Sequence, residues 1–219
     1  MASNIGKGYN GNQVLRNCSF SFDGNGVYVL TGPNGCGKST FLRICAFLES
    51  PDKGEVTYFS GDTAVPCGID LMRRISLVLP RIGIFNTSVF NNAAFGLRIR
   101  DKTRNEKEER VDRILAFVGL EQKKKQNALT LSSGEAQRLG LARAMVIEPE
   151  ILFLDEPTAS VDQANRRIIE GIILDMQKKG TSTVVITTHD MKQARRLADR
   201  LLVMDEGKIS EMGDSAISV

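Results

Sequence analysis

A short segment rich in glycine, with a lysine and hydroxyl residues, offers the first chemistry in this sequence. The segment TGPNGCGKST, residues 31–40, lies between an apolar run and residues with helical spacing. Gly32 and Gly37 enclose four residues, and Lys38 and Ser39 follow at once, which is the spacing of a phosphate-binding loop. In such a loop, backbone N–H groups cradle an anion, and the following helix start adds partial positive charge. We predict that Lys38 reaches the β- and γ-phosphates of a nucleotide and that Ser39 holds Mg²⁺.

A pair of adjacent carboxylates provides the second chemical signal. The run ILFLDEP, residues 151–157, is an apolar strand pattern that ends in Asp155 and Glu156. If the strand belongs to a parallel sheet, its carboxyl end lies at the same edge as the phosphate-binding loop. Asp155 can then hold Mg²⁺ directly or through water, and Glu156 can orient an attacking water or accept its proton.

The elements that must position these residues are predicted by apolar periodicity. Short strand-like runs begin at residues 27, 75, 151, 183 and 201, and read VYVLT, ISLVLP, ILFLDE, TVVITTHD and LLVMDEG. Helical spacing separates the later runs, as in Leu139, Ala142 and Met145. This alternation predicts an α/β fold, with a P-loop core whose mostly parallel sheet is covered on both faces. VLRNCSFSF and GEVTYFSGD, near the start of the chain, instead predict an N-terminal antiparallel β subdomain.

Residues 100–126 differ from the rest because they are dense in charges of both signs. An apolar stripe runs through this segment, formed by Val111, Ile114, Leu115 and Val118. The pattern predicts a solvated helical subdomain, inserted into the core at about residues 81–132 of a single domain spanning residues 1–219. The lysines at 123–125 are interpreted as a helix end or loop, with a basic binding patch as the weaker alternative.

Composition excludes several classes of protein. The chain has 219 residues, 42% of them hydrophobic, and a net charge of +3, which is too small to indicate a nucleic-acid binder. Its four cysteines lack metal-binding spacing, and a disulfide framework is improbable in so large a chain, so a reducing cytosol is expected. No export signal and no membrane-spanning run is found, so any membrane association is expected to come through a partner.

Between the two phosphate-related motifs stands LSSGEAQRLGLARAMVIEPE, residues 131–150. It resembles the ATP-binding-cassette (ABC) ATPases, whose signature LSGGQ or LSGGE stands here as Leu131–Glu135. The resemblance continues through LDEPTASVD, where Asp162 matches the D-loop, and VVITTHDM, where His189 matches the switch histidine. Tyr9 stands where the family keeps an aromatic residue that stacks on adenine. Together these motifs span nearly the whole chain in the family's order.

The resemblance implies a head-to-tail homodimer with two composite sites. Ser132 and Gly134 of one subunit would close over ATP held by Lys38 of the other, hydrolysis at Glu156 would release the dimer, and His189 would contact the γ-phosphate. The expected catalytic residues are Glu156, His189 and Lys38, and the expected metal ligands are Ser39 and Asp155. The expected nucleotide contacts are Tyr9, Gly32, Pro33, Asn34, Gly35, Cys36, Gly37, Lys38, Ser39, Thr40, Ser132, Ser133, Gly134 and Asp162. A lone histidine such as His189 is otherwise often a structural hydrogen-bonding residue.

Two positions depart from the family pattern. Pro80, in VLPRIGIF, stands where the family has a glutamine, so the amide that would touch Mg²⁺ or the attacking water is lost. Proline also stiffens the backbone at an expected hinge. Ser133 replaces a signature glycine, so its Cβ and hydroxyl must fit where backbone would approach a phosphate. A working but slow ATPase is expected.

The segment RIGIFNTSVFNNAAFGLRIR, residues 81–100, resembles the region through which transporter ATPases dock a helix of their membrane subunit. The chain therefore looks like the ATPase subunit of an importer, most similar to those for oxyanions such as tungstate, molybdate or phosphate. The implied partners are a membrane permease and an extracytoplasmic substrate-binding protein, with the chain on the inner face of the cell membrane. Two alternatives remain: a non-transport cassette ATPase acting on DNA or ribosomes, and a degenerate slow ATPase serving as a regulatory module.

Overall fold

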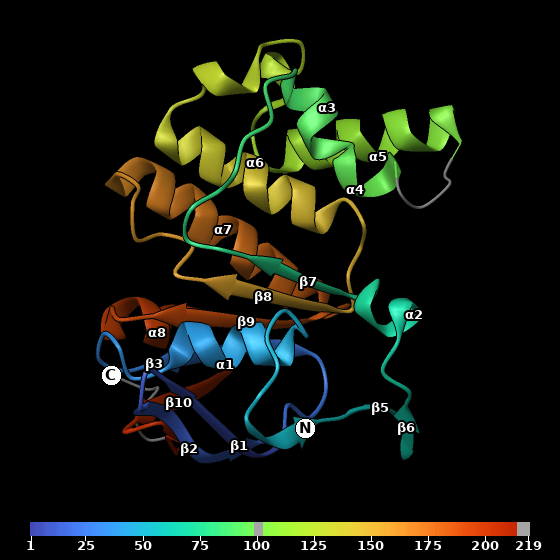
Figure 1. Ribbon diagram of the computed structural model, residues 1–219. Coiled ribbons are helices and arrows are strands. Elements are labelled where there is room, and N and C mark those ends of the chain that lie inside the picture. The colour runs from blue at the N-terminus through green and yellow to red at the C-terminus, as the bar shows by residue number, and fades with distance from the viewer. Residues whose placement is uncertain (99–102, 214–219) are drawn as a thin grey trace.

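A computed structural model of the chain describes residues 1–98 and 103–213. The predicted helical subdomain includes residues 99–102, and the predicted docking segment includes residues 99 and 100; these residues lie outside the described residues. Within the described residues, a six-stranded sheet has the order β11-β10-β3-β9-β8-β7 (Figure 1). Its strands are β3 (Gly26–Thr31), β7 (Ile75–Val78), β8 (Ile151–Asp155), β9 (Thr183–Thr188), β10 (Arg200–Asp205) and β11 (Lys208–Glu211). All neighbouring strands are parallel except β10 and β11, which confirms the predicted mostly parallel sheet.

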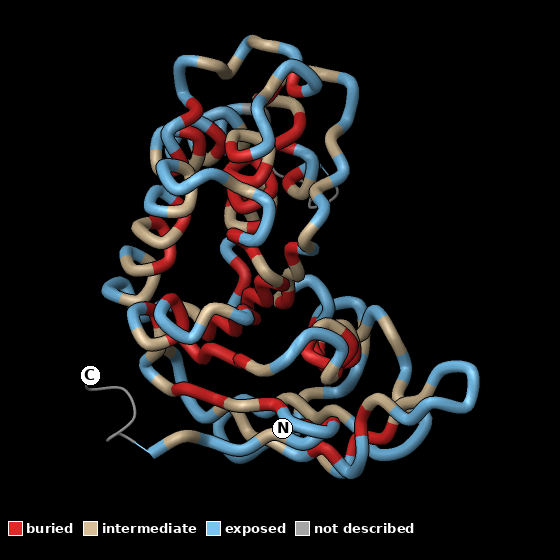
Figure 2. Tube along the Cα trace, turned by 90° about the vertical axis from the view of Figure 1, so that its left-hand side faces the viewer, coloured by how far each residue is buried: buried red, intermediate tan, exposed pale blue. Residues whose placement is uncertain are grey.

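Both faces of this sheet are buried, as its continuous apolar strands predict. Neighbouring residues of one strand belong to different hydrophobic clusters: Val29 packs into one and Leu30 into the other, and Leu152 and Phe153 are divided in the same way. This alternation follows from the two-residue period of a strand. Figure 2 shows the buried residues gathered along the sheet and the inner sides of the helices.

Helices of different segments cover the two faces. The helices α6 (Ser133–Met145), α7 (Gln163–Lys179) and α8 (Met191–Leu197) contribute buried residues to the cluster that contains Val29. The helix α1 (Lys38–Cys45) contributes Phe41 and Leu42 to the cluster on the opposite face. Figure 1 accordingly shows α6 and α7 on one side of the sheet and α1 on the other.

The early part of the chain forms antiparallel β structure, which confirms that prediction. The strands β1 (Ala2–Tyr9), β2 (Asn12–Phe20) and β4 (Lys53–Val56) pair in the order β2-β1-β4. The strands β5 (Tyr58–Ser60) and β6 (Thr63–Val65) form a separate hairpin, followed by the short helix α2 (Ile69–Met72). The three-stranded sheet packs its inner residues, such as Ile5 and Leu15, against the face that α1 covers.

The segment between β7 and α6 begins without regular structure at residues 79–88 and then forms helices in its described part. It contains α3 (Val89–Ala93), α4 (Phe95–Arg98), α5 (Arg104–Phe117) and the 3₁₀ turns η1 (Glu121–Lys123) and η2 (Ala128–Thr130). Val111, Leu115 and Val118 of the predicted stripe are fully buried. Lys123 pairs with Glu135 and Lys124 with Asp112, so this lysine run belongs to a turn at the end of the helical segment. Within the described residues, no helix has the length and apolar content to cross a bilayer.

Candidate active site

The predicted phosphate-binding loop curls between β3 and α1. Gly32 has a φ of +150°, and a Cβ there would lie 2.2 Å from the carbonyl oxygen of Met204, so only glycine fits. Lys38 Nζ donates to the carbonyl oxygens of Gly32 at 2.9 Å and Pro33 at 3.0 Å. The lysine is only 5% exposed, so its ammonium lies inside the curl of the loop.

The other predicted loop residues differ in exposure. Pro33, Asn34 and Gly35 are exposed, whereas Gly37 and Thr40 are buried and Cys36 is half-buried. The exposed tip can be reached by a nucleotide from solvent. The Thr40 hydroxyl instead accepts a hydrogen bond from the Arg43 guanidinium at 3.4 Å, inside the protein.

The loop and the first carboxylate are joined by direct hydrogen bonds. Ser39 Oγ donates to Asp155 Oδ1 at 2.9 Å, and Thr187 Oγ1 donates to the same oxygen at 2.7 Å. Asp155 ends β8 and is only 2% exposed, while Thr187 lies near the end of the neighbouring β9. Hydroxyl and carboxylate oxygens are the hard ligands that Mg²⁺ prefers, so the pair Ser39 and Asp155 fits that ion. The described residues contain no cluster of three or more His, Cys, Asp or Glu side chains that could hold a metal by themselves.

The second carboxylate faces the only histidine of the chain. Glu156 Oε2 lies 3.3 Å from His189 Nδ1, and the histidine side chain is 56% exposed. Glu156 has a φ of +46°, which is strained for a residue with a side chain and is a feature of functional sites. Its backbone N–H donates to Thr187 Oγ1 at 2.9 Å. The Thr187 hydroxyl therefore holds both acidic residues in place: it donates to the Asp155 carboxylate and accepts from the Glu156 backbone N–H.

The predicted signature loop forms the start of α6. The Ser132 hydroxyl caps the helix by accepting from the Glu135 N–H at 3.3 Å, and the Glu135 carboxylate accepts from the Ser132 N–H at 3.0 Å. Lys123 Nζ lies 2.5 Å from the Glu135 carboxylate, and this ion pair lowers the pKa of Glu135. Ser132 and Ser133 are exposed, while Gly134 is buried.

Gly134 is buried because the start of α7 packs directly on it. A Cβ at Gly134 would lie 2.1 Å from Cγ of Asn165. Asn165 in turn donates to the predicted D-loop residue Asp162 with its backbone N–H at 2.9 Å and its side chain at 2.7 Å. These hydrogen bonds lower the pKa of Asp162. The signature loop and the D-loop of one chain are thus in contact through Asn165.

Tyr9 lies at the end of β1, apart from the phosphate-binding loop in sequence. Its hydroxyl donates to the Glu49 carboxylate, and Lys7 Nζ lies 5.6 Å from its ring centroid. Lys7 also pairs with Glu49 at 3.5 Å and Asp52 at 3.1 Å. Tyr9 is 39% exposed, so part of the residue is accessible to a ligand.

Pro80 follows β7, which ends at Val78 beside Leu154 of β8. Because β7 and β8 are parallel, Pro80 leaves the sheet at the edge where Asp155 lies. The position is therefore at the correct edge for the family's glutamine.

Sequence reasoning missed three polar residues that support this arrangement. They are Thr187, which bonds Asp155, Asn165, which packs on Gly134, and Glu49, which holds Tyr9. The threonine lies in a strand, where its type is common, so only its position just before His189 could have indicated it.

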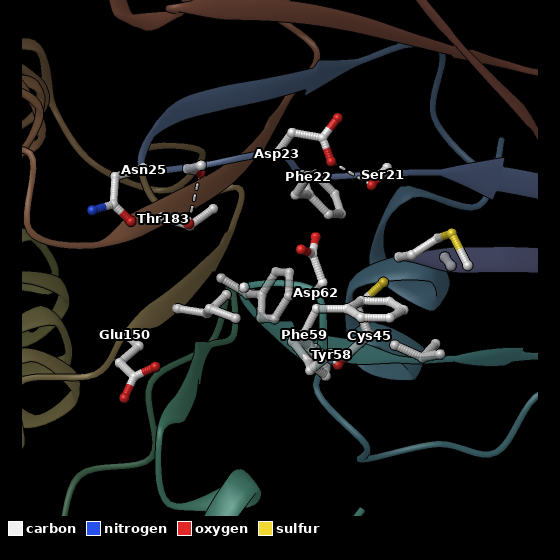
Figure 3. Close-up of a pocket in the computed structure, with 17 residues that line it drawn as sticks. Ser21, Phe22, Asp23, Asn25, Cys45, Tyr58, Phe59, Asp62, Glu150 and Thr183 are labelled. Atoms are coloured by element: carbon white, nitrogen blue, oxygen red, sulfur yellow. Dashed lines mark hydrogen bonds between the residues drawn. The ribbon is translucent and has the colours of Figure 1, made fainter. Parts of the chain in front are cut away.

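A cavity of about 610 Å³ lies elsewhere, between the antiparallel strands, the β5–β6 hairpin and the sheet (Figure 3). Its lining includes Ile151 and Thr183, which are the first residues of β8 and β9, whereas Asp155 and Thr188 end these strands. The cavity therefore opens at the amino edge of the sheet, and none of the predicted site residues lines it.

Comparison with known proteins places this geometry in a family. The family model described as ABC transporter matches residues 15–159. The tungstate uptake system ATP-binding protein TupC of Peptoclostridium acidaminophilum is 37% identical over 209 residues, 95% of each protein. The sulfate/thiosulfate import ATP-binding protein CysA of Mesostigma viride is 35% identical over 214 residues, covering 97% of this chain but 61% of that protein.

A solved structure agrees with these sequence relatives. CbiO1 of Clostridium perfringens, described as part of the ABC transporter complex cbiONQ, superposes with a TM-score of 0.81 and 28% identity. The match covers 95% of this chain and 85% of that one. The fold, the matched family model and the near full-length relative agree, and the chain belongs to the ABC transporter family, as one of its ATP-binding ATPase subunits.

Proposed function

We propose that this chain hydrolyses ATP, between two copies of itself, to drive an ABC importer for an oxyanion such as tungstate. Residues 1–219 would act as one nucleotide-binding domain, with a helical subdomain at about residues 81–132. The observation that carries the catalytic part is the set of side chains at the carboxyl edge of the sheet. There Lys38, the pair Ser39 and Asp155, and the pair Glu156 and His189 converge.

The chemistry follows from this arrangement. Lys38 would neutralise charge on the β- and γ-phosphates, and Ser39 and Asp155 would hold Mg²⁺, which supplies further charge neutralisation on the phosphates. Glu156 Oε2 would accept a proton from the attacking water. His189 lies beside Glu156 and is largely exposed, so it can reach both that water and the γ-phosphate.

A second copy is needed because the two anion-binding helix starts lie on opposite faces of the sheet. Lys38 begins α1 on one face, and the exposed Ser132 and Ser133 begin α6 on the other. A head-to-tail pair with two-fold symmetry would bring the signature loop of each copy to the phosphate-binding loop of the other. Two identical composite sites would result.

The proposed head-to-tail pair of chains also accounts for the remaining nucleotide contacts. Tyr9 would stack on adenine, and Asp162 would approach the site from the start of α7. The backbone and side chains of the loop would surround the phosphates, with Gly32, Pro33, Asn34, Gly35, Cys36, Gly37 and Thr40 as the contributing residues. Ser133 is exposed, so its hydroxyl can be accommodated at the closing surface.

Coupling to a membrane partner is supported by an apolar surface near Pro80. Leu79, Phe85 and Phe95 are exposed, Phe85 and Phe95 stack at 4.7 Å between ring centroids, and Arg143 lies 5.2 Å from the Phe85 centroid. A cavity of about 280 Å³ adjoins them between β7 and α6. We propose that a helix of the permease docks here, which would hold the chain on the inner face of the membrane beside a substrate-binding protein outside.

Import and an oxyanion substrate are supported by the relatives. The tungstate uptake protein matches along nearly its whole length, and sulfate/thiosulfate and phosphate import proteins match at 34–35% identity. Polyamine import proteins match at 34–37% identity, so the oxyanion rests on the fuller match to the tungstate protein, of which 95% is covered.

The test is ATP hydrolysis by the chain alone and in proteoliposomes with its permease and binding protein, with Glu156→Gln as the inactive control. We expect a slow basal rate that rises with the permease and rises again when tungstate and the binding protein are added. Stimulation by DNA or ribosomes instead would support the non-transport alternative. No hydrolysis under any of these conditions would support the degenerate regulatory module.

A further inference from the structure

A buried amide on α8 connects the segments that carry the proposed catalytic residues. Gln193 is only 1% exposed and lies in the first turn of α8. Its Oε1 accepts from Thr188 Oγ1 at 2.8 Å, and its Nε2 donates to Glu170 Oε1 at 2.8 Å. Thr158 Oγ1 lies 2.8 Å from Nε2 and 3.1 Å from Oε1. Both amide hydrogens and the amide oxygen therefore have partners inside the protein.

Each partner belongs to a different functional segment. Thr158 is two residues after Glu156, Thr188 immediately precedes His189, and Glu170 lies on α7, whose first turn is capped by Asp162. The Thr188 hydroxyl also accepts from the Asp190 N–H at 3.1 Å, so it shapes the turn that carries His189. One side chain thus links the loop after β8, the end of β9 and the body of α7.

We propose that Gln193 is a positioning residue that keeps His189 in contact with Glu156 and connects the segments of both residues to α7. The proposal deepens the proposed ATP hydrolysis and rests on it for the rate, while the geometry of His189 can be measured without any hydrolysis. A buried hydrogen-bond network with every member satisfied rigidifies the groups it joins. Loss of the Gln193 amide would therefore leave His189 free to move from its position 3.3 Å from the Glu156 carboxylate.

The network also specifies an amide rather than a carboxylate at this position. Glu170 is 13% exposed at its side chain, and its Oε1 accepts from both Gln193 Nε2 and Arg196 Nη2, the latter at 2.9 Å. An ionised carboxylate at 193 would have no hydrogen to donate and would face the Glu170 carboxylate. The double substitution Gln193→Glu/Glu170→Gln exchanges the two groups. The contact between positions 193 and 170 then again has one hydrogen-bond donor and one acceptor.

This exchange gives the test. Gln193→Glu is compared with Gln193→Glu/Glu170→Gln, and with Lys192→Gln as a matched control that changes the net charge by the same amount at an exposed position of α8. The measurements are kcat, ATP affinity, the unfolding midpoint, and the ring signals of His189 in a histidine-selective NMR spectrum of the nucleotide-free chain. The chain has one histidine, so the spectrum reports this residue alone.

We expect Gln193→Glu to lower kcat about tenfold or more, with ATP affinity within about twofold of the parent and displaced His189 ring signals. The double exchange should return kcat to within about threefold and the ring signals to their parental positions. Lys192→Gln should leave all four measurements near the parental values. If Gln193→Glu does not fold, Thr188→Val provides the second variant, since it removes the hydroxyl that bonds both the Gln193 amide and the Asp190 N–H in the histidine turn.

Unchanged His189 signals in Gln193→Glu, or in Thr188→Val, would overturn the proposal. So would a kcat that stays low after the double exchange although the unfolding midpoint is restored, because the network would then be purely structural. A parent chain that does not hydrolyse ATP would refute the proposed function, and displaced His189 signals in Gln193→Glu would still support the positioning role.

Discussion

The edge that carries Glu156 and the start of α6 that carries Ser132 are both predicted to act on the same nucleotide, yet they are built differently. At the first, Ser39, Asp155 and Thr187 are joined by hydrogen bonds of 2.7–2.9 Å inside the protein. At the second, Ser132 and Ser133 are exposed, and the helix start is held by its capping box, by the ion pair of Lys123 with Glu135 and by the packing of Gly134 against Asn165.

The difference supports the proposal that one half of the site is formed within a single chain and that the other half is completed by a partner. At the carboxyl edge, Asp155 contacts Ser39 and Thr187, and Glu156 contacts His189. The start of α6 presents the exposed Ser132 and Ser133, on the opposite face of the sheet from α1. Hydrolysis should therefore depend on dimer formation, while ATP binding should not.

The largest expected effect comes from breaking, at Glu156, the half formed within a single chain. Glu156→Gln removes the proposed acceptor of the proton from water, so kcat should fall by about 10²–10⁴-fold. The amide keeps the shape and adds no charge, so ATP affinity should stay within a few-fold. Steady-state hydrolysis and calorimetric titration measure the two quantities, and a variant that turns over ATP like the parent would remove Glu156 from catalysis.

Lys38→Ala breaks the same half at the binding step. In the proposed site the buried ammonium would make a charge-assisted contact to phosphate, and its loss should cost about 1.5–3 kcal/mol, or roughly tenfold to a hundredfold in ATP affinity. Calorimetry with ATP is the measurement. An unchanged affinity would show that the loop does not bind the phosphates.

The other half can be broken by filling Gly134. Gly134→Ala would place a Cβ 2.1 Å from Asn165 Cγ, so the Asn165 side chain must leave Asp162, at a cost of about 1–3 kcal/mol in unfolding free energy. Gly171→Ala on α7 is the matched control, because a Cβ there meets no atom within 4 Å, and it should stabilise by about 0.5–1 kcal/mol. Urea unfolding measures both, and equal effects of the two substitutions would refute the packing argument.

The smallest expected effect is at Pro80, where the half formed within a single chain departs from the family. Pro80→Gln should supply the missing amide at the edge near Asp155 and raise basal hydrolysis by less than tenfold, under about 1.4 kcal/mol in barrier. The isolated chain is assayed at steady state. An unchanged or lower rate would mean that Pro80 does not stand in for the family's glutamine.

These regions also show what a sequence can predict. Strands ending in Asp155 and before His189 are predictable because fully apolar runs followed by polar residues are typical of a parallel sheet. The apolar stripe of Val111, Leu115 and Val118 is predictable in the same way from its helical period. Local periodicity therefore locates the catalytic edge and the buried face of α5.

The supporting residues are not predictable in this way. Gln193 bonds Thr158 and Glu170 across 35 and 23 residues of sequence, and the contact of Gly134 with Asn165 depends on how α6 packs on α7. Nothing in their local sequence distinguishes them from ordinary helix residues. Only the tertiary packing brings their hydrogen-bonding groups together.

The most direct test of the divided site measures the oligomeric state of Glu156→Gln, with and without Ser133→Arg. Analytical ultracentrifugation in the presence of Mg²⁺ and ATP provides this measurement. Ser133 is exposed and does not cap α6, so the arginine should block closure without unfolding the helix. We predict that Glu156→Gln forms an ATP-dependent dimer and that Glu156→Gln/Ser133→Arg stays monomeric. At a protein concentration where both variants are monomeric, their ATP affinities should agree within about twofold. A double variant that still dimerises with ATP, or a monomer whose ATP affinity is lost with Ser133→Arg, would contradict a site shared between two chains.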